Sequence, residues 1–528
     1  MGRPTMRVAI YNAHWPTLGG GEQQAGGLAG ALSRDHDVEL LVEEEFDAIT
    51  ASERLGFDIT PFPQRELEPG TIPFLEASAD YDLLVNSSFS STHASRAGRS
   101  LYYVQFPEPH AELNKRRALL IATRRNPYHG WIEYGRGFWL PEFAGHGSWT
   151  HGQASVTLNL PRGVPFPFSF RLDANSWPAD RHPRVTIELD GDTIFDGPVD
   201  HGDPVTVRTE VVGRGFERPS LVTLASDTFV PRVLLGTDDD RELGVVVSHL
   251  RLGPASPGVR RGELARLRRV RDLQFVNEFL DSYQLITANS PYTAKWVERL
   301  WNRSAVVLSP PVQLRAPGPK RRIILGVGRF FPNVSGHSKK QVELVQAFRL
   351  ACERGLRDWE LHLVGGCKAV DRAYAEEARK AAVGLPVRFH INARGEDVAE
   401  LFGAAEIFWH AAGFGEDREL RPDRFEHFGI TVVEAMSAGA VPLVYAHGGP
   451  ADIVEAARCG RTYETLDQLA SETLALAADD AERRRLSDLG VAASTQYSYD
   501  EFAQHARELV AELLATGAER DRPRRGAP

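Results

Sequence analysis

Short apolar runs alternate with helical segments at both ends of this chain, and this alternation limits the folds open to it. The runs in the first part are residues 6–11, 38–42, 81–85 and 101–104, with a helix predicted at 22–32. The later runs are residues 285–288, 322–327, 360–364, 387–391, 407–411 and 441–445. Strands that alternate with helices indicate parallel sheets with crossover helices, so the sequence predicts two α/β units.

Between residues 130 and 255 the pattern changes, and apolar and polar residues alternate with a period of two. The alternating segments are residues 156–160, 168–172, 185–189, 205–211, 221–224 and 245–252. Asp190-Gly191 is typical of a hairpin turn, because both residues tolerate a left-handed backbone. We therefore predict an all-β sandwich inserted into the first α/β unit, and we interpret the acidic runs 190–192 and 238–240 as turns rather than metal ligands.

Composition excludes several classes of protein. The chain carries a formal net charge of -10, whereas a general nucleic-acid binder needs a basic surface, so no nucleic-acid partner is expected. Its 3 scattered cysteines do not support a disulfide framework or a zinc cluster, and they favour a reducing compartment. No run approaches the roughly 20 apolar residues of a membrane span. We expect a cytoplasmic protein.

The most informative stretch begins at Glu426 and ends at Gly439. Gly429 allows a sharp turn into a helix that starts near Ile430 or Thr431, and the unpaired amides of such a helix start attract anions. Glu426 precedes this helix and Glu434 lies about one turn inside it. We predict that the two carboxylates flank one cavity at different depths.

A second glycine turn and a group of cations complete the predicted site. Gly448 and Gly449 precede another helix at the carboxyl end of a parallel strand, which is where open α/β sheets bind ligands. In the second unit, Arg329 ends the turn that follows the strand at 322–327. Ten residues later, Lys339 and Lys340 begin an amphipathic helix. Fixed cations there would stabilise charge on a departing diphosphate, and helix phase favours Lys339 over Lys340.

These motifs resemble those of glycosyltransferase family 4. The resemblance rests on EHFGITVVEAMSAGAVPLVYAHGGPADIV at 426–454, GVGRF at 326–330, KKQVELVQAF at 339–348, GGGE at 19–22, TANSPYT at 287–293 and PPV at 310–312. The EHFGI form is most similar to α-mannosyltransferases of the dolichol pathway. The resemblance covers roughly residues 5–107 and 270–500, and it implies the GT-B fold, in which two Rossmann-like domains face a cleft.

The same resemblance implies roles for individual residues. Arg329 and Lys339 would hold the donor phosphates, Glu434 would accept the ribose hydroxyls, and Glu426 would face the donor sugar. The other residues implied for donor binding are Gly429, Ile430, Thr431, Lys340, Gly448 and Gly449, and the loop residues implied on the acceptor side are Gly20, Gly21 and Gln105. Members of this family retain anomeric configuration and need no metal or cofactor, since the nucleotide-diphosphate sugar is a co-substrate.

One position departs from the related mannosyltransferases, which carry a histidine over the donor sugar. Here the matching residue is Gln105, in the segment YVQFP at 103–107. Glutamine can donate or accept a hydrogen bond but cannot act as a base near neutral pH. His14 and His110 are candidates to supply that contact, unless no such contact is required.

The resemblance also suggests domain limits. We expect an N-terminal acceptor domain at residues 1–129 and 256–315, hinge included, interrupted by the sandwich at 130–255. A C-terminal nucleotide-sugar domain is expected at 316–490. Helices at 491–517 could cross back to the first domain, and the tail at 518–528 is expected to be disordered.

Several alternatives remain open from the sequence. The leading hypothesis is a retaining transferase that moves a hexose such as mannose to a glycan, lipid-linked or other hydroxyl acceptor. A different donor such as UDP-glucose, or a non-catalytic sugar-binding protein on the same scaffold, is the alternative. The arginine-rich segment 260–271 fits a solvated helix face or peripheral contact with an anionic membrane surface. The sandwich could bind carbohydrate through Trp149 or Trp177, or serve structure or oligomerisation.

Overall fold

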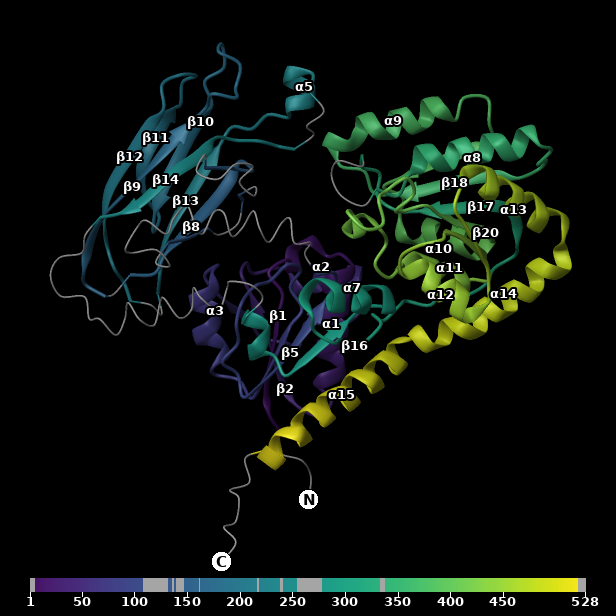
Figure 1. Ribbon diagram of the computed structural model, residues 1–528, viewed down its shortest axis with the longest axis horizontal. Helices are drawn as coiled ribbons and strands as arrows, with labels where there is room; N and C mark the ends of the chain where they lie inside the picture. The colour runs from purple at the N-terminus through teal and green to yellow at the C-terminus, as the bar shows by residue number, and fades with distance from the viewer. Residues whose placement is uncertain are drawn as a thin grey trace, which may run out of the picture.

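The chain forms three parts, two of them α/β domains and one built from antiparallel strands (Figure 1). The computed structural model describes residues 5–107, 132–134, 137–138, 147–160, 162–215, 218–237, 241–253, 278–332 and 338–520. His110, the acidic run 238–240, the arginine-rich segment 260–271 and the end of the chain from 521 onward lie outside these residues.

The N-terminal domain is built on a 7-stranded sheet in the order β16-β15-β5-β4-β1-β2-β3, with parallel pairing throughout. Its strands are β1 (Arg7–Tyr11), β2 (Asp37–Val42), β3 (Gln64–Glu66), β4 (Leu83–Asn86), β5 (Arg99–Val104), β15 (Leu285–Ala288) and β16 (Val306–Val307). Its helices are α1 (Gly20–Leu32), α2 (Ala48–Leu55), α3 (Thr71–Ser78) and α7 (Pro291–Trp301). The central strands are buried on both faces, as parallel sheets covered by helices require.

The C-terminal domain repeats this plan with a 6-stranded parallel sheet in the order β19-β18-β17-β20-β21-β22. Its strands are β17 (Arg321–Val327), β18 (Glu360–Gly365), β19 (Val387–Ile391), β20 (Ala405–His410), β21 (Val441–Tyr445) and β22 (Arg461–Tyr463). Its helices are α8 (Gln341–Glu353), α9 (Arg372–Ala381), α10 (Gly395–Ala404), α11 (Ile430–Ser437), α12 (Gly449–Ala457), α13 (Leu466–Ala478) and α14 (Asp480–Ser494). The predicted fold class, two α/β units with an inserted β region, is confirmed.

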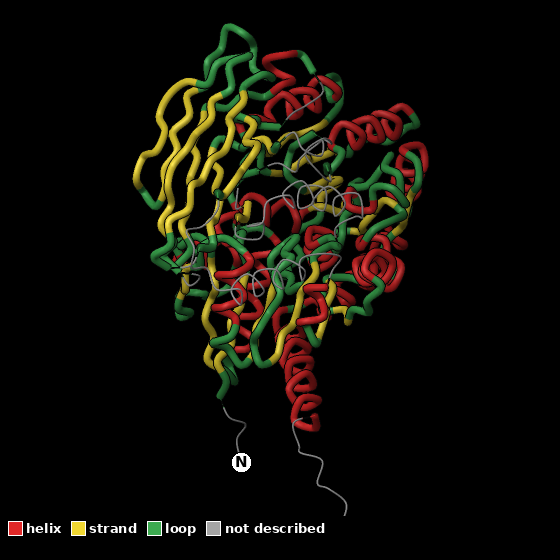
Figure 2. The backbone as a smooth tube through the Cα atoms, turned by 60° about the vertical axis from the view of Figure 1, so that its left-hand side comes forward, coloured by secondary structure: helices red, strands yellow, loops and turns green. Residues whose placement is uncertain are grey.

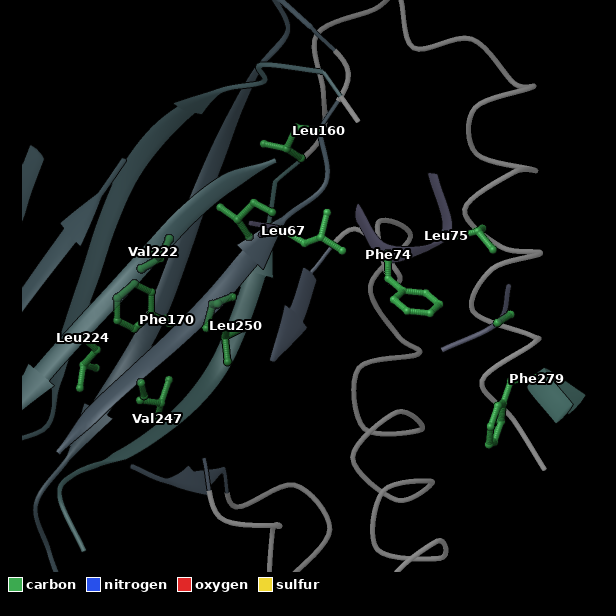
Figure 3. Close-up of a cluster of buried hydrophobic side chains, with 14 of the residues drawn as sticks. Leu67, Phe74, Leu75, Leu160, Phe170, Val222, Leu224, Val247, Leu250 and Phe279 are labelled. Atoms are coloured by element: carbon green, nitrogen blue, oxygen red, sulfur yellow. The ribbon is translucent and has the colours of Figure 1, made fainter. Parts of the chain in front are cut away.

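The inserted part consists of two antiparallel sheets, with orders β11-β10-β13-β8-β6 and β12-β9-β14-β7. Their strands are β6 (Ile132–Tyr134), β7 (Ser148–Trp149), β8 (Gln153–Leu158), β9 (Pro165–Asp173), β10 (Arg184–Leu189), β11 (Asp192–Pro198), β12 (Val205–Val212), β13 (Ser220–Ser226) and β14 (Val246–Leu252). A short helix, α5 (Pro231–Leu235), precedes the last strand. Buried residues of both sheets, among them Val222 and Phe170, belong to one apolar cluster (Figure 3), so the sheets share a core.

A turn and a tryptophan of the sandwich had been singled out from the sequence. Asp190 and Gly191 adopt positive φ values of 53° and 91° between β10 and β11, so the predicted hairpin turn is confirmed. Trp177 is buried, and its indole N–H donates to the carbonyl of Gly244 at 2.6 Å. Trp177 is therefore part of the core and does not offer an exposed stacking surface for a sugar.

The sandwich also packs on the first domain. Leu160 of the sandwich and Leu67, which follows β3, belong to the same buried cluster (Figure 3). The hydroxyl of Thr157 donates to the carbonyl of Pro69 at 2.7 Å. The insert is thus joined to the N-terminal domain by apolar packing and a hydrogen bond.

The long C-terminal helix α15 (Tyr499–Arg520) leaves the second domain and lies against α1 of the first (Figures 1 and 2). Glycines on α1 allow this close approach. A Cβ atom on Gly27 would lie 2.9 Å from Pro311 Cγ and 3.1 Å from Phe502 Cε1, and one on Gly30 would lie 2.6 Å from the Tyr499 hydroxyl. Of the described helices, α15 included, none combines the length and apolar character needed to cross a bilayer.

Candidate functional site

Two glycine turns bring the starts of α11 and α12 side by side. Gly429 and Gly448 have φ values of 104° and 93°, a region that side-chain-bearing residues rarely adopt. The N–H of Gly449 donates to the carbonyl of Glu426 at 2.8 Å. A Cβ atom on Gly449 would lie only 2.3 Å from the carbonyl oxygen of His427. Glycine is therefore required where the two turns touch, and the start of α12 is bonded to the backbone of Glu426.

Lys339, Glu426 and His410 meet beside these turns. The ammonium of Lys339 forms an ion pair with Oε2 of Glu426, and Nε2 of His410 lies 3.1 Å from the same oxygen. The side chains of Lys339 and Glu426 are 19% and 16% exposed, which leaves them partly accessible to solvent. The stem of Lys339 crosses Gly328, where a Cβ atom would lie 2.4 Å from its Cγ. The predicted proximity of Lys339, Glu426 and the turn after β17 is thus present.

His410 was not singled out from the sequence, although its strand was predicted. It is the last residue of β20, in the middle of the sheet, and it is buried. Burial lowers the pKa of its imidazole, while the hydrogen bond to Glu426 opposes this effect. A histidine at the carboxyl end of a central parallel strand, 16 residues before Glu426, is the signal that could have identified it.

Arg329 lies at the exposed end of the turn after β17. Its guanidinium lies 5.3 Å from the ring centroid of Phe331. The side-chain amide of Gln341 donates to the carbonyls of Gly328 and Arg329, both at 3.1 Å, and this pins the turn to the start of α8. Arg329 therefore presents its charge from a rigid backbone at the same edge of the sheet as Lys339.

Lys340 belongs to a different group. It has a left-handed backbone with φ 58°, so its side chain diverges from that of Lys339. Its ammonium lies 2.7 Å from Oε1 of Glu416, and both side chains are buried. Arg424 lies 3.8 Å from the other oxygen of this carboxylate. This geometry places Lys340 outside the group around Glu426, and we expect it to stabilise the loop 412–425 rather than to bind a donor.

Glu434 is held by Arg315, the last residue of the segment predicted to contain the hinge. Nε and Nη2 of Arg315 donate to Oε1 of Glu434 at 3.0 and 2.6 Å. Burial raises the pKa of Glu434, and Arg315 opposes that rise. The backbone N–H of Arg315 donates to the Ser437 hydroxyl at 2.9 Å, which ties the linker to the end of α11. Arg315 thus sets the orientation of the Glu434 carboxylate.

The first loop of the N-terminal domain is organised by the buried carboxylate of Glu22. Its oxygens accept from the Asn12 amide at 3.1 Å, and from the Thr17 hydroxyl and the Gly19 N–H at 2.7 Å each. The loop is held close to the second domain, since a Cβ atom on Gly20 would lie 3.1 Å from Cδ1 of Ile430. Gly20 and the first residue of α11 therefore face one another across the domain interface.

Gln105 lies at the same junction. A Cβ atom on Gly21 would lie 2.3 Å from its Nε2, and this nitrogen donates to the carbonyl of Ser87 at 3.2 Å. The structure thus brings Gly20, Gly21 and Gln105 together beside Ile430, while Thr431 follows in the first turn of α11. His14, one of the alternatives to Gln105, is exposed in the first loop, where its N–H donates to Asn12.

His427 belongs to the C-terminal domain and contacts the N-terminal domain next to Gln105. Its ring stacks on Phe106 with centroids 4.1 Å apart, and its carbonyl accepts from the Ser290 hydroxyl at 2.5 Å. Burial lowers the pKa of His427 to about 4, so the ring is neutral near neutral pH. The EHFGI segment therefore contains both the glycine turn before α11 and a contact between the domains.

Metal ligands form no group at this site. Within the described part of the chain, three or more His, Cys, Asp or Glu residues nowhere come together in an arrangement that could hold a metal ion. Independence from metals stays a prediction.

Comparison with known proteins shows similarity to glycosyltransferases in sequence and in fold. Residues 315–490 match the family model described as Glycosyl transferases group 1. The GDP-Man:Man(3)GlcNAc(2)-PP-Dol alpha-1,2-mannosyltransferases of Xenopus laevis and Dictyostelium discoideum are 26% and 24% identical over 185 and 233 residues. These matches cover 31% and 39% of this chain, which spans only 35% and 44% of the length of those relatives.

Glycogen synthase of Rhodopseudomonas palustris is 34% identical over 131 residues, which are 22% of this chain and 27% of that protein. Among solved structures, Anabaena HepE in complex with UDP has a TM-score of 0.51 at 13% identity, covering 96% of this chain and 99% of that one. A glycosyltransferase from Rickettsia africae has a TM-score of 0.51 at 11% identity, covering 97% and 99%. The molecule has the GT-B fold, and its residues 315–490 are similar to the glycosyl transferases group 1 family.

Proposed function

We propose that this chain is a retaining glycosyltransferase that moves a hexose from a nucleotide-diphosphate sugar to a hydroxyl acceptor. The observation that carries the proposal is the meeting of Lys339 and Glu426 beside the paired helix starts of α11 and α12, with Arg329 at the same sheet edge. A diphosphate is the ligand that fits two fixed cations and two helix starts. A carboxylate next to these cations suits the hydroxyls of the attached sugar.

In the proposed reaction, the bond between the anomeric carbon and the diphosphate oxygen breaks while a bond to the acceptor oxygen forms on the same face. The acceptor proton passes to the departing phosphate oxygen, so atoms and charges balance. Arg329 and Lys339 stabilise the negative charge that grows on the diphosphate. Because no separate base is needed, Gln105 can occupy the place of the usual histidine and serve as a neutral hydrogen-bonding group.

The nucleoside would lie over α11, with its ribose hydroxyls donating to Glu434. Arg315 supports this role because it orients the buried carboxylate and opposes the rise in the pKa of Glu434 that burial causes. The acceptor would lie against the N-terminal loop that carries Gly20, Gly21 and Gln105.

The relatives suggest the donor and the acceptor. The names of the mannosyltransferases specify GDP-mannose and a dolichol-linked glycan, and a HepE structure contains UDP and glucose. We propose a GDP- or UDP-hexose donor and a glycan or lipid-linked acceptor, used at the cytoplasmic side of a membrane. Such an acceptor would bring the protein into peripheral contact with an anionic membrane surface.

A thermal-shift panel of GDP, UDP, ADP and dTDP sugars tests the proposal. A ligand at 100 times its Kd stabilises the folded state by about 2.7 kcal/mol, so the correct nucleotide should stand out. Consumption of that sugar nucleotide then separates an enzyme from a sugar-binding protein on the same scaffold. A panel without any stabilising nucleotide would contradict the proposed function, and binding without turnover would favour the sugar-binding alternative.

A further inference from the structure

Two hydrogen-bond donors of different kinds meet on a single oxygen of Glu426. Oε2 of this carboxylate pairs with the Lys339 ammonium and lies 3.1 Å from Nε2 of His410. The side chain of Lys339 is 19% exposed, whereas that of His410 is only 4% exposed. The two contacts therefore differ in how easily a ligand can disturb them.

The surroundings of His410 define its hydrogen-bonding state. Among the residues that the structure describes, its Nδ1 is buried and has no hydrogen-bond partner. A buried N–H without an acceptor costs more than a buried lone pair without a donor, because the N–H loses its hydrogen bond to water outright. The neutral tautomer with the proton on Nε2 is therefore favoured, and this N–H donates to Glu426.

His410 is also held rigidly by the sheet. It pairs with Val444 of the neighbouring strand β21, and its carbonyl accepts from the Tyr463 hydroxyl at 2.9 Å. The donor of its hydrogen bond thus has a fixed position in the fold. A carboxylate that accepts from it is fixed in turn.

We infer that His410 is the positioning residue for Glu426, and that it keeps this carboxylate in place when a diphosphate draws Lys339 away. This inference rests on the proposed function. A donor diphosphate competes with Glu426 for the Lys339 ammonium, since both are anions within reach of one cation. Glu426 then retains the hydrogen bond from His410 and stays directed toward the sugar. Without His410, loss of the lysine contact leaves the carboxylate without this anchor.

The experiment compares His410→Leu with His410→Gln, using GDP-mannose and UDP-glucose as donors and GDP and UDP as binding probes. Leucine fills a similar volume without a donor group, whereas the glutamine amide can donate from nearly the same place as Nε2. We expect His410→Leu to lower kcat for consumption of the sugar nucleotide by about tenfold to a hundredfold, the loss typical of one hydrogen bond to a charged group. The Kd for GDP or UDP should change less than about twofold, because the free nucleotide lacks the sugar. His410→Gln should recover most of the loss.

His362→Leu is the matched control. His362 is also a buried strand histidine, with Nε2 2.9 Å from Oε2 of Glu360, but it lies on β18 outside the site. Its replacement should leave kcat unchanged. A double variant adds an independent readout, since His410→Leu should cost little further activity in a Glu426→Gln background if it acts through Glu426.

The outcomes separate this inference from the proposed function. An active wild-type protein whose kcat is unaffected by His410→Leu would overturn the positioning role alone. A variant that loses kcat and nucleotide affinity together, or a double variant with fully additive losses, would show a general structural role and also overturn it. A wild-type protein that neither binds GDP or UDP nor consumes a sugar nucleotide would instead overturn the proposed function.

Discussion

The imidazole of His427 stacks on the ring of Phe106 across the interface of the two α/β domains, with ring centroids 4.1 Å apart. The same histidine accepts a hydrogen bond from Ser290 through its carbonyl. Contact between the domains therefore passes through the residue that follows Glu426. Conditions that charge this ring should weaken the domain contact and the site together.

Acid should destabilise the protein through His427. Burial lowers its pKa from 6.5 to about 4, so the unfolded chain binds a proton that the folded chain excludes. The contribution of neutral His427 to the free energy of unfolding is therefore complete above pH 6.5 and is lost as the pH falls toward 4. It amounts to roughly 3 kcal/mol. As the pH falls from 6.5 toward 4, the free energy of unfolding measured in urea should decrease more in wild type than in His427→Phe. Parallel pH profiles would contradict the assignment.

Arg329→Ala and Lys339→Ala should lower kcat by about a hundredfold while changing KM much less, because their charges matter most as the diphosphate departs. Steady-state kinetics with the donor found in the nucleotide panel would measure this. Arg322→Ala is the control, since Arg322 is an exposed arginine near the other end of β17. If both site variants raise KM alone, the transition-state role is wrong. EDTA should not affect the rate, and a loss restored by a divalent ion would argue against the mechanism.

Glu434→Ala should weaken binding of the nucleotide by about 1–3 kcal/mol, because the ribose hydroxyls lose a charged acceptor. Isothermal titration calorimetry would measure it. Arg315→Met should instead destabilise folding by about 3–5 kcal/mol, since it leaves a buried carboxylate without its partner. The double variant Arg315→Met/Glu434→Gln should regain part of that loss. An unchanged nucleotide affinity in Glu434→Ala would exclude the ribose contact.

Gly27→Ala and Gly30→Ala should have different effects on stability, although alanine is favoured over glycine by about 1 kcal/mol in any helix. A Cβ atom on Gly27 would press on Pro311 and the ring of Phe502, whereas one on Gly30 would meet only the hydroxyl end of Tyr499. We expect Gly27→Ala to destabilise by about 1–3 kcal/mol and Gly30→Ala to be neutral or stabilising. Equal values from urea unfolding would show that α15 does not pack tightly on α1.

Local sequence features predicted the parallel strands and the two glycine turns well. A short apolar run with glycine at its end defines a buried strand with little help from the rest of the chain, as in β17 and β21. Gly429 and Gly448 were predictable for the same reason, since their positive φ is a local requirement.

Contacts between distant residues were not predictable. Arg315 and Glu434 are 119 positions apart, and a linker sequence gives no sign that one arginine returns to a buried carboxylate. Lys339 and Lys340 contact different carboxylates because Lys340 has a left-handed backbone, which helix periodicity does not reveal. His410 became recognisable only when the fold placed it against Glu426.

Removing the sandwich should leave nucleotide binding intact, because the residues around Glu426 and Glu434 come from the two α/β domains. We expect a variant in which a short Gly/Ser linker replaces residues 132–254 to bind GDP or UDP within about twofold of wild type by calorimetry. The deletion exposes Leu67, which packs beside the sandwich strands (Figure 3), so Leu67→Ser in the same variant should improve its solubility. Acceptor use should change if the insert binds carbohydrate, and oligomeric state should change if it serves oligomerisation. A soluble variant that has lost nucleotide affinity would mean that the sandwich reaches the donor site, and the separation of roles between the three parts would be wrong.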